Sequence, residues 1–300
     1  MLDKLVLKLK CRLLDRDRVC PPKHHENNDP TIFRFQGCDI RELVDKVTQW
    51  ASHRESDASL STMQQSALDD YRTNPIYQLS NVKGFGEKAV LRAYFLLFDK
   101  LFFGQTLERY TELHVPDRDW SWGRKISGQN FWRICWFSRT NFLKVQCGIT
   151  VYPRNKISDM KLRCLQRIGI LLHEMIHVFF RIYHHQKSVT WPVYYSTLGY
   201  TGHGPAWQEV AYALEQACRD PGFLNLGSSL KLSRRSHFLC DYSVSNQYGQ
   251  GYENNPWGLD VAWAEQICIA MNTAAKRTIG FGDIVPQVMR QVGVNCGCIL

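Results

Sequence analysis

The stretch IGILLHEMIHVFF, from Ile168 to Phe180, decides how this chain folds and what it can bind. Apolar side chains recur on almost every turn, which predicts a buried helix within a longer helical stretch from about 159 to 183. On such a helix His173 and His177 are four residues apart, so they share one face and can present both imidazoles to a single ion. The stretch therefore predicts a buried metal-binding helix.

Glu174 lies between the two histidines, completes an HExxH pattern and flanks the ligand face. From there its carboxylate can hold a metal-bound water rather than the metal itself. Zinc lowers the pKa of that water, and the glutamate takes its proton as the water attacks a carbonyl. The alternative, two helix histidines with a chance glutamate, is disfavoured because burying these groups without a partner is costly. We therefore expect His173 and His177 to bind zinc and Glu174 to act as the catalytic base.

Two histidines do not complete a zinc site, and the residues after His177 limit the choice of a third ligand. The metzincin pattern needs glycine at 180 and histidine at 183, where this chain has Phe180 and Tyr183, so that class is excluded. His184 lies on the His177 face but about 10 Å further along the helix, too far to reach the same ion. We expect His184 and His185 to be solvated at the helix end.

His203 is the favoured third ligand, in the sequence GHGPAW. Its flanking glycines permit a close backbone approach, and Pro205 suits the first turn of a helix predicted from 205 to 218. Apolar residues at core spacing would let that helix pack beside the metal helix and fix His203 in place. The rival ligand is Glu209, as in enzymes that use two histidines and a glutamate.

At these residues the chain resembles the SprT-like zinc metalloprotease family, which includes the Spartan-type DNA-dependent proteases. The resemblance rests on LLHEMIH at 171–177 and GHGPAW at 202–207, with support from FDKLFFGQTL at 98–107, and it covers roughly residues 88–219. It implies a compact α+β, zincin-like domain in which a small sheet packs on helices that include the HExxH helix. It also implies that the three histidines bind Zn²⁺, that Glu174 is the catalytic base, and that the substrates are proteins trapped on DNA.

The chain also departs from the family pattern. Many bacterial members carry a C-terminal zinc ribbon, whereas no CxxC pair occurs here. The 25 residues between the second and third histidines are many for a Spartan-type domain. This insert, about 183–200, contains Trp191, Tyr194 and Tyr195 and could form a lid or a substrate wall. Tyr200 and the insert tyrosines are the candidates for stabilising an oxyanion, and none of them can be singled out.

Patterns elsewhere predict an α+β domain with an antiparallel or mixed sheet. Helices are expected at 40–50, 89–103 and 259–276, strands at 111–115, 131–137 and 145–152, and loops at 81–86 and 243–255. The predicted organisation is an N-terminal extension over 1–83, a metalloprotease domain over 84–222 and a C-terminal extension over 223–300.

The net charge of +9 is concentrated in the predicted domain. Residues 84–222 contain 18 basic and 11 acidic side chains, whereas the two flanking regions are each within one charge of neutral. Between 118 and 167 there are 11 basic groups and several aromatic rings, a combination that suits phosphates and stacked bases. The candidate nucleic-acid contacts are Arg124, Lys125, Arg133, Arg139 and Lys144. The alternative is a sheet with aromatic residues in the core and cations in water.

Composition limits the setting in which the protein works. No window approaches the roughly 18 consecutive apolar residues of a membrane span, which predicts a soluble protein without a membrane partner. The basic, discontinuous start of the chain does not resemble a secretory signal, and the 11 scattered cysteines do not form a disulfide framework. We therefore expect an intracellular protein, with the nucleus suggested by family analogy alone.

Together these features predict a zinc-dependent metallopeptidase that acts on a protein substrate, with DNA-associated proteins as one candidate class. The alternative is a non-catalytic, zinc-stabilised nucleic-acid-binding or scaffold protein. The intact Glu174 argues against it, because a structural site does not need that carboxylate and usually closes with a fourth protein ligand. A zinc hydrolase of small amides also remains compatible with the sequence.

Overall fold

The computed structural model describes residues 37–52, 60–116, 133–138, 146–152, 157–184, 197–199, 201–247 and 266. Its longer helices are α2 (Ile40–Ser52), α3 (Thr62–Thr73), α5 (Glu87–Phe102), α6 (Met160–Tyr183), α8 (Pro205–Arg219) and α9 (Arg234–Gln247). Short 3-10 turns at Pro75–Tyr77 and Leu79–Asn81 and the single-turn helix α4 (Val82–Phe85) join α3 to α5. The arrangement is α+β, as the sequence predicts.

Three strands form one small mixed sheet in the order β1-β3-β2. These are β1 (Thr111–His114), β2 (Arg133–Ser138) and β3 (Gln146–Val151). β1 runs parallel to β3 and β2 runs antiparallel to it. All three lie where the sequence predicts strands.

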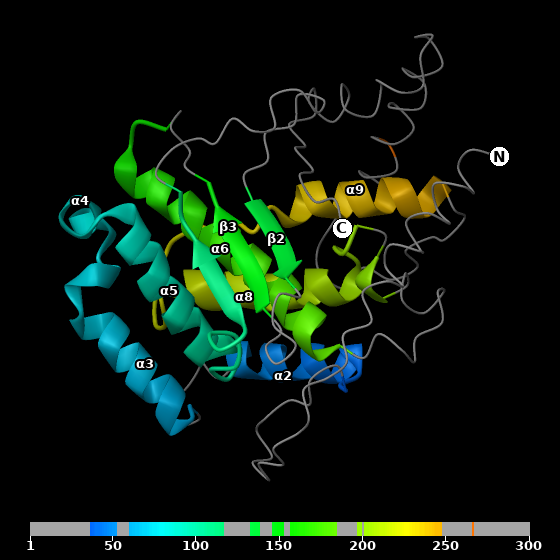
Figure 1. Cartoon of the computed structure of the whole chain (residues 1–300), viewed down its shortest axis with the longest axis horizontal. Coiled ribbons are helices and arrows are strands. Elements are labelled where there is room, and N and C mark those ends of the chain that lie inside the picture. Colours follow the sequence, from blue (N-terminus) through cyan, green and yellow to red (C-terminus); the bar gives the residue numbers. More distant parts are fainter. Residues whose placement is uncertain are drawn as a thin grey trace.

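The helix α6 passes behind the sheet and is buried along most of its length (Figure 1). It begins where Asp159 accepts a hydrogen bond from the Leu162 amide, and it ends at Tyr183, as the apolar pattern predicts. It packs against β2 and β3 and against α5 and α8. This position places its histidine face between α8 and the segment that leads into α9.

The helix α5 is fixed at both ends by hydrogen-bonded carboxylates, of which Asp99 is buried and Glu87 is partly exposed. At its end, Gly104 takes a positive φ of 63°, and Asp99 accepts hydrogen bonds from the Leu107 and Glu108 amides. Burial raises the pKa of Asp99 to about 6 in spite of these hydrogen bonds. At its start, Glu87 accepts hydrogen bonds from two arginines of α6. Burial alone would raise the pKa of Glu87, but the arginine hydrogen bonds outweigh it and hold that pKa below its usual value.

One hydrophobic core extends across both predicted domain boundaries. It includes Leu43 and Val47 of α2, residues of α5, α6 and α8, and Leu230 and Leu232 beyond the second boundary. The helix α2 packs directly on α8, which belongs to the predicted metalloprotease domain. Residues 37–52 and 223–232 therefore contribute to the same core as the sheet and the HExxH helix.

Three local expectations from the sequence differ from the structure. The predicted loop at 81–86 contains α4, a single helical turn. The start of the predicted loop at 243–255 belongs to α9, which the sequence did not predict. His184 is 2% exposed rather than solvated, and its backbone pairs with Cys38 beside α2, whereas His185 lies outside the described residues. The predicted helix at 259–276 lies outside the described residues, except that Gln266 is helical.

Among the residues that the structure describes, no helix is both long enough and apolar enough to cross a membrane.

Candidate metal centre

Three imidazoles that the sequence singles out converge in the structure. His173 and His177 come from α6, and His203 comes from the turn just before α8. Each pair of their Nε2 atoms is 3.1 Å apart. His173 and His203 are buried, whereas His177 is partly exposed. A residue separation of four within one helix explains the first pair, and packing of α8 on α6 adds the third ring.

The spacing of these nitrogens suits a single small metal ion. Imidazole nitrogens lie about 2.0–2.1 Å from zinc, so two of them at a tetrahedral angle are about 3.3–3.4 Å apart. The observed 3.1 Å separations are close to this value for all three pairs. The triangle of Nε2 atoms can therefore surround one ion without a change of fold.

Hydrogen bonds fix the tautomer of His173. Its Nδ1 lies 3.0 Å from the Leu232 carbonyl oxygen, 59 residues later in the chain. A carbonyl oxygen only accepts, so Nδ1 carries the proton and donates it. In the neutral imidazole, Nε2 is then left with a lone pair that points at the other histidines.

The same reasoning applies to His203. Its Nδ1 lies 3.0 Å from the Thr201 hydroxyl, and that hydroxyl donates its own proton to Asp241 Oδ1 at 2.8 Å. The hydroxyl oxygen must therefore accept from Nδ1–H, which leaves Nε2 of His203 unprotonated in the neutral ring.

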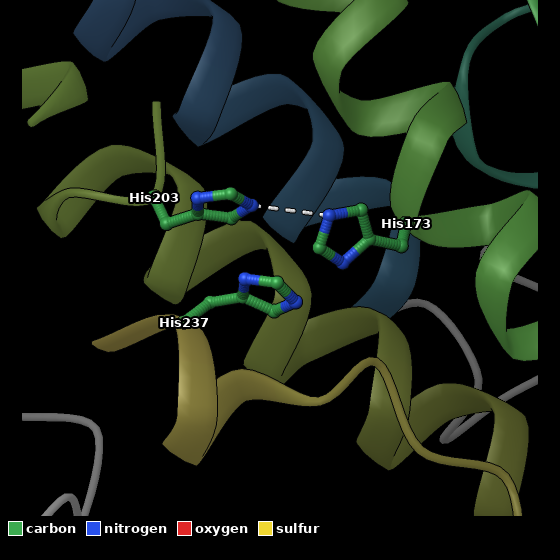
Figure 2. Close-up of side chains that lie close together, drawn as sticks. All are labelled: His173, His203 and His237. Carbon is green, nitrogen blue, oxygen red and sulfur yellow. Dashed lines mark hydrogen bonds between the residues drawn. The ribbon is translucent and has the colours of Figure 1, made fainter. Parts of the chain in front are cut away.

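Two unprotonated nitrogens cannot hydrogen-bond to each other. The Nε2 atoms of His173 and His203 face each other at 3.1 Å, along the dashed line in Figure 2. Between neutral rings this contact is unfavourable unless a cation lies between the lone pairs. Metal-binding histidines in proteins usually donate the N–H of their other ring nitrogen to a carbonyl oxygen, a carboxylate or water. The two Nδ1–H groups here have partners of this kind, a carbonyl for one ring and a hydroxyl–carboxylate pair for the other. The donor set suits zinc, copper, iron or nickel.

Glu174 is placed beside the cluster but not within it. Its side chain is only 3% exposed, and its Oε1 is 3.9 Å from the Nε2 of His173. That distance is too long for a direct hydrogen bond and leaves the carboxylate next to the space that the imidazoles enclose. This is the flanking position that the HExxH spacing predicts.

The ring of Trp207 packs against all three converging histidines. Its centroid lies 4.6 Å from that of His173 and 4.8 Å from that of His203, and it stacks on His177 at 5.8 Å. The tryptophan is fully buried on α8. It therefore shields the three imidazoles from solvent on the α8 side and limits how far each can rotate.

The rival ligand Glu209 is engaged elsewhere. Its two carboxylate oxygens each accept a hydrogen bond from the Arg41 guanidinium of α2 at 2.7 Å. This bidentate ion pair links α8 to α2 and occupies both oxygens. The structure therefore brings His203, and not Glu209, to the histidines of α6.

A fourth histidine lies in this region, His237 of α9, and the sequence patterns did not predict it as a site residue. It is 2% exposed, and its ring stacks on that of His203 with centroids 4.2 Å apart and an interplanar angle of 17°. Figure 2 shows it beneath His203, facing the same space as His173. The potential ligand atoms of His173, His203 and His237 lie within 4.8 Å of one another, so this buried cluster could also bind a metal ion. No spacing signal marks His237, because it is 60 residues from the HExxH motif.

Other predicted site residues cannot be compared with the structure. Arg124, Lys125, Arg139 and Lys144 lie outside the described residues, as do the insert tyrosines and Tyr200. Arg133 is part of β2, but its side chain is outside the description. The nucleic-acid face therefore stays a prediction.

No family model, no curated protein and no solved structure matches the chain. The resemblance to SprT-like metalloproteases thus remains a prediction that rests on the two histidine motifs.

Proposed function

We propose that this protein is a zinc-dependent metallopeptidase in which His173, His177 and His203 hold the ion and Glu174 is the catalytic base. One observation carries the proposal: the three Nε2 atoms lie 3.1 Å from one another, next to a buried glutamate. In two of these rings the hydrogen bond of Nδ1 leaves Nε2 with a lone pair that faces the other histidines. Zinc bound there would supply Lewis-acid activation of a water and of the scissile carbonyl.

The side chain of Glu174 performs the proton transfers in this proposal. Its carboxylate, 3.9 Å from His173 Nε2, accepts a proton from the attacking water and later delivers it to the leaving amine. His177 is the partly exposed member of the histidine triangle, so the peptide would approach from its side. The Nδ1 hydrogen bonds of His173 and His203 keep their rings oriented during these steps.

The family and substrate belong to the same proposal. The HExxH helix packed on a small mixed sheet is compatible with a SprT-like, zincin-type domain. DNA-associated proteins are the substrate class that the family resemblance and the basic and aromatic region favour, and a nuclear location rests on the family resemblance alone.

A second function is favoured by His237. A structural zinc site usually closes with four protein ligands, and His237 lies beside His203 and His173. If its imidazole completed the coordination, the protein would be a zinc-stabilised scaffold or nucleic-acid-binding protein without peptidase activity.

The test compares wild type with Glu174→Gln, which removes the base but not a histidine. Glu209→Gln is the matched control, because it removes a carboxylate from α8 that is paired with Arg41. Each full-length protein is loaded with zinc, its metal content is measured, and it is incubated with a DNA-binding protein in the presence and absence of single-stranded DNA.

We expect all three proteins to hold one zinc, and wild type and Glu209→Gln to cleave while Glu174→Gln loses at least about 10²-fold in rate. Cleavage that also needs DNA would support the Spartan-like role, and cleavage without DNA would indicate a general peptidase. Equal cleavage by Glu174→Gln would contradict the proposed mechanism. Zinc binding without any cleavage by wild type would favour the scaffold function.

A further inference from the structure

The loop that carries His203 is short and rich in glycine, and α9 lies against it. Gly199 and Gly202 both have a φ of 77°, a conformation that side-chain-bearing residues rarely adopt. The amide of Gly204 donates to the Leu198 carbonyl oxygen at 2.8 Å, which closes the loop. This backbone hydrogen bond does not reach the imidazole of His203, whose Nδ1 is instead contacted by the Thr201 hydroxyl.

We propose that Asp241 of α9 is a positioning residue for the metal centre and that it acts on His203 through Thr201. The inference rests on the proposed function, because it concerns the same three-histidine site. It assigns α9, which lies beyond the predicted metalloprotease domain, an indirect part in metal binding, through the orientation of a ligand.

Asp241 is seated inside the His203 loop. Its Oδ1 accepts hydrogen bonds from the Thr201 amide at 2.6 Å and from the Thr201 hydroxyl at 2.8 Å, and the residue is fully buried. A Cβ at Gly199 would lie 2.1 Å from Asp241 Oδ2, so only glycine at that position admits the carboxylate. A buried carboxylate is costly unless it is hydrogen-bonded, and here the loop supplies the donors.

The hydrogen bonds form a chain with one direction. His203 Nδ1–H donates to the Thr201 hydroxyl, and the hydroxyl donates to the Asp241 carboxylate. The negative charge at the end of the chain favours the proton on Nδ1, so Nε2 keeps its lone pair toward the metal. In many metal sites a carboxylate accepts a hydrogen bond directly from a ligand histidine. Here a hydroxyl lies between the carboxylate and the histidine, and the effect on the imidazole is of the same kind.

The segment that leads into α9 orients a second ligand. The Leu232 carbonyl accepts from His173 Nδ1, while the Leu232 amide donates to Glu215 of α8 at 2.7 Å. Arg234, at the start of α9, lies 3.8 Å from the same Glu215 carboxylate. Residues 232–241 are therefore anchored on α8 and touch two of the three proposed ligands.

The experiment measures zinc affinity of the full chain by competition with a chromophoric chelator, together with the visible absorption of the Co²⁺-loaded protein. Thr201→Val keeps the shape of the side chain but removes the hydroxyl, and Thr201→Ser keeps the hydroxyl. Asp241→Asn removes the charge. The control is Asp220→Asn, which removes a carboxylate at the far end of α8 that accepts from the Gly222 amide.

We expect Thr201→Val and Asp241→Asn to bind zinc about 10- to 100-fold more weakly than wild type and to change the Co²⁺ spectrum. Thr201→Ser and Asp220→Asn should stay within about threefold of wild type. Circular dichroism of the metal-free proteins establishes that each variant is folded. If Asp241→Asn does not fold, the comparison of Thr201→Val with Thr201→Ser decides the question.

Wild-type affinity in Thr201→Val, or an equal loss in Thr201→Val and Thr201→Ser, would overturn the inference. The variant His173→Ala separates this failure from failure of the metal centre itself. If His173→Ala loses zinc while Thr201→Val keeps it, the three-histidine site stands and only the role of Asp241 is wrong. If His173→Ala binds zinc as wild type does, the proposed function is wrong as well.

Discussion

At the scale of single residues, the candidate metal centre consists of buried and partly buried polar side chains. His173 is oriented by the Leu232 carbonyl, 59 residues away, and His203 by the neighbouring Thr201 hydroxyl, which donates in turn to Asp241 of α9. Each buried group is acceptable because its hydrogen bonds replace those it would make with water. The residue types could be read from the sequence, but their protonation states follow from contacts that only the fold creates.

Asp99 gives a prediction about pH at this scale. Its pKa is raised from an ordinary value of 3.8 to about 6 by burial, so the folded protein binds its proton more tightly than the unfolded chain does. The stability from this group is therefore complete below about pH 4 and is lost as the pH rises through about 6. Asp99→Asn cannot titrate at this position.

The free energy of unfolding, measured in denaturant, should thus fall in wild type relative to Asp99→Asn by about 2 kcal/mol between pH 4.5 and 7.5. Subtracting the variant removes the pH dependence of all other groups. A difference that stayed constant, or that rose with pH, would contradict the assigned pKa direction.

At the scale of elements, the geometry around His173 of α6 depends on how closely the neighbouring segments approach that helix. Gly169 lies one turn before His173 on α6, and a Cβ built there would be 2.6 Å from the Lys231 carbonyl oxygen. The next carbonyl along, that of Leu232, is the one that accepts from His173. The glycine therefore lets the segment before α9 lie directly on α6.

Gly169→Ala should lower the free energy of unfolding by about 1–3 kcal/mol, because the Lys231 backbone must move away from α6. It should also weaken zinc binding, since the Leu232 carbonyl moves with that backbone. Gly84→Ala is the matched control: a Cβ there has nothing within 4 Å, and alanine is the better helix former in α4. Denaturant unfolding and chelator competition measure both effects, and equal stability of the two variants would argue against the close approach.

At the scale of the whole molecule, the core joins segments that the sequence analysis assigned to three regions. One hydrophobic cluster contains residues as far apart in the sequence as Leu43 of α2 and Leu232, just before α9. The Arg41–Glu209 ion pair adds a polar link between α2 and α8. We therefore expect α2 to unfold together with the metal centre rather than as an independent extension.

Leu43→Ala tests this expectation, because Leu43 is fully buried on α2. The substitution should lower the free energy of unfolding by about 2–5 kcal/mol and move helix loss and zinc release to lower denaturant together. Lys46→Ala, on the exposed face of the same helix, should change stability by less than about 0.5 kcal/mol. Loss of helix at lower denaturant than zinc release would show that α2 is a separate folding unit.

The sequence alone determined the elements whose burial is periodic. In α5, α6 and α8, apolar side chains recur at helical spacing, so the local pattern predicts each helix to within a few residues. The spacing of four residues also brings His173 and His177 to one face. These features depend on interactions between near neighbours, which a sequence pattern records directly.

Only the tertiary structure decided the rest of the site. The helix α9 was not predicted because its buried face includes His237 and Asp241, polar residues that a hydrophobic pattern does not mark. The exclusion of Glu209 depends on Arg41, 168 residues away, and the seat of Asp241 depends on Thr201, 40 residues away. Such polar contacts form only where the fold brings both partners to the same place, and no local sequence pattern marks them.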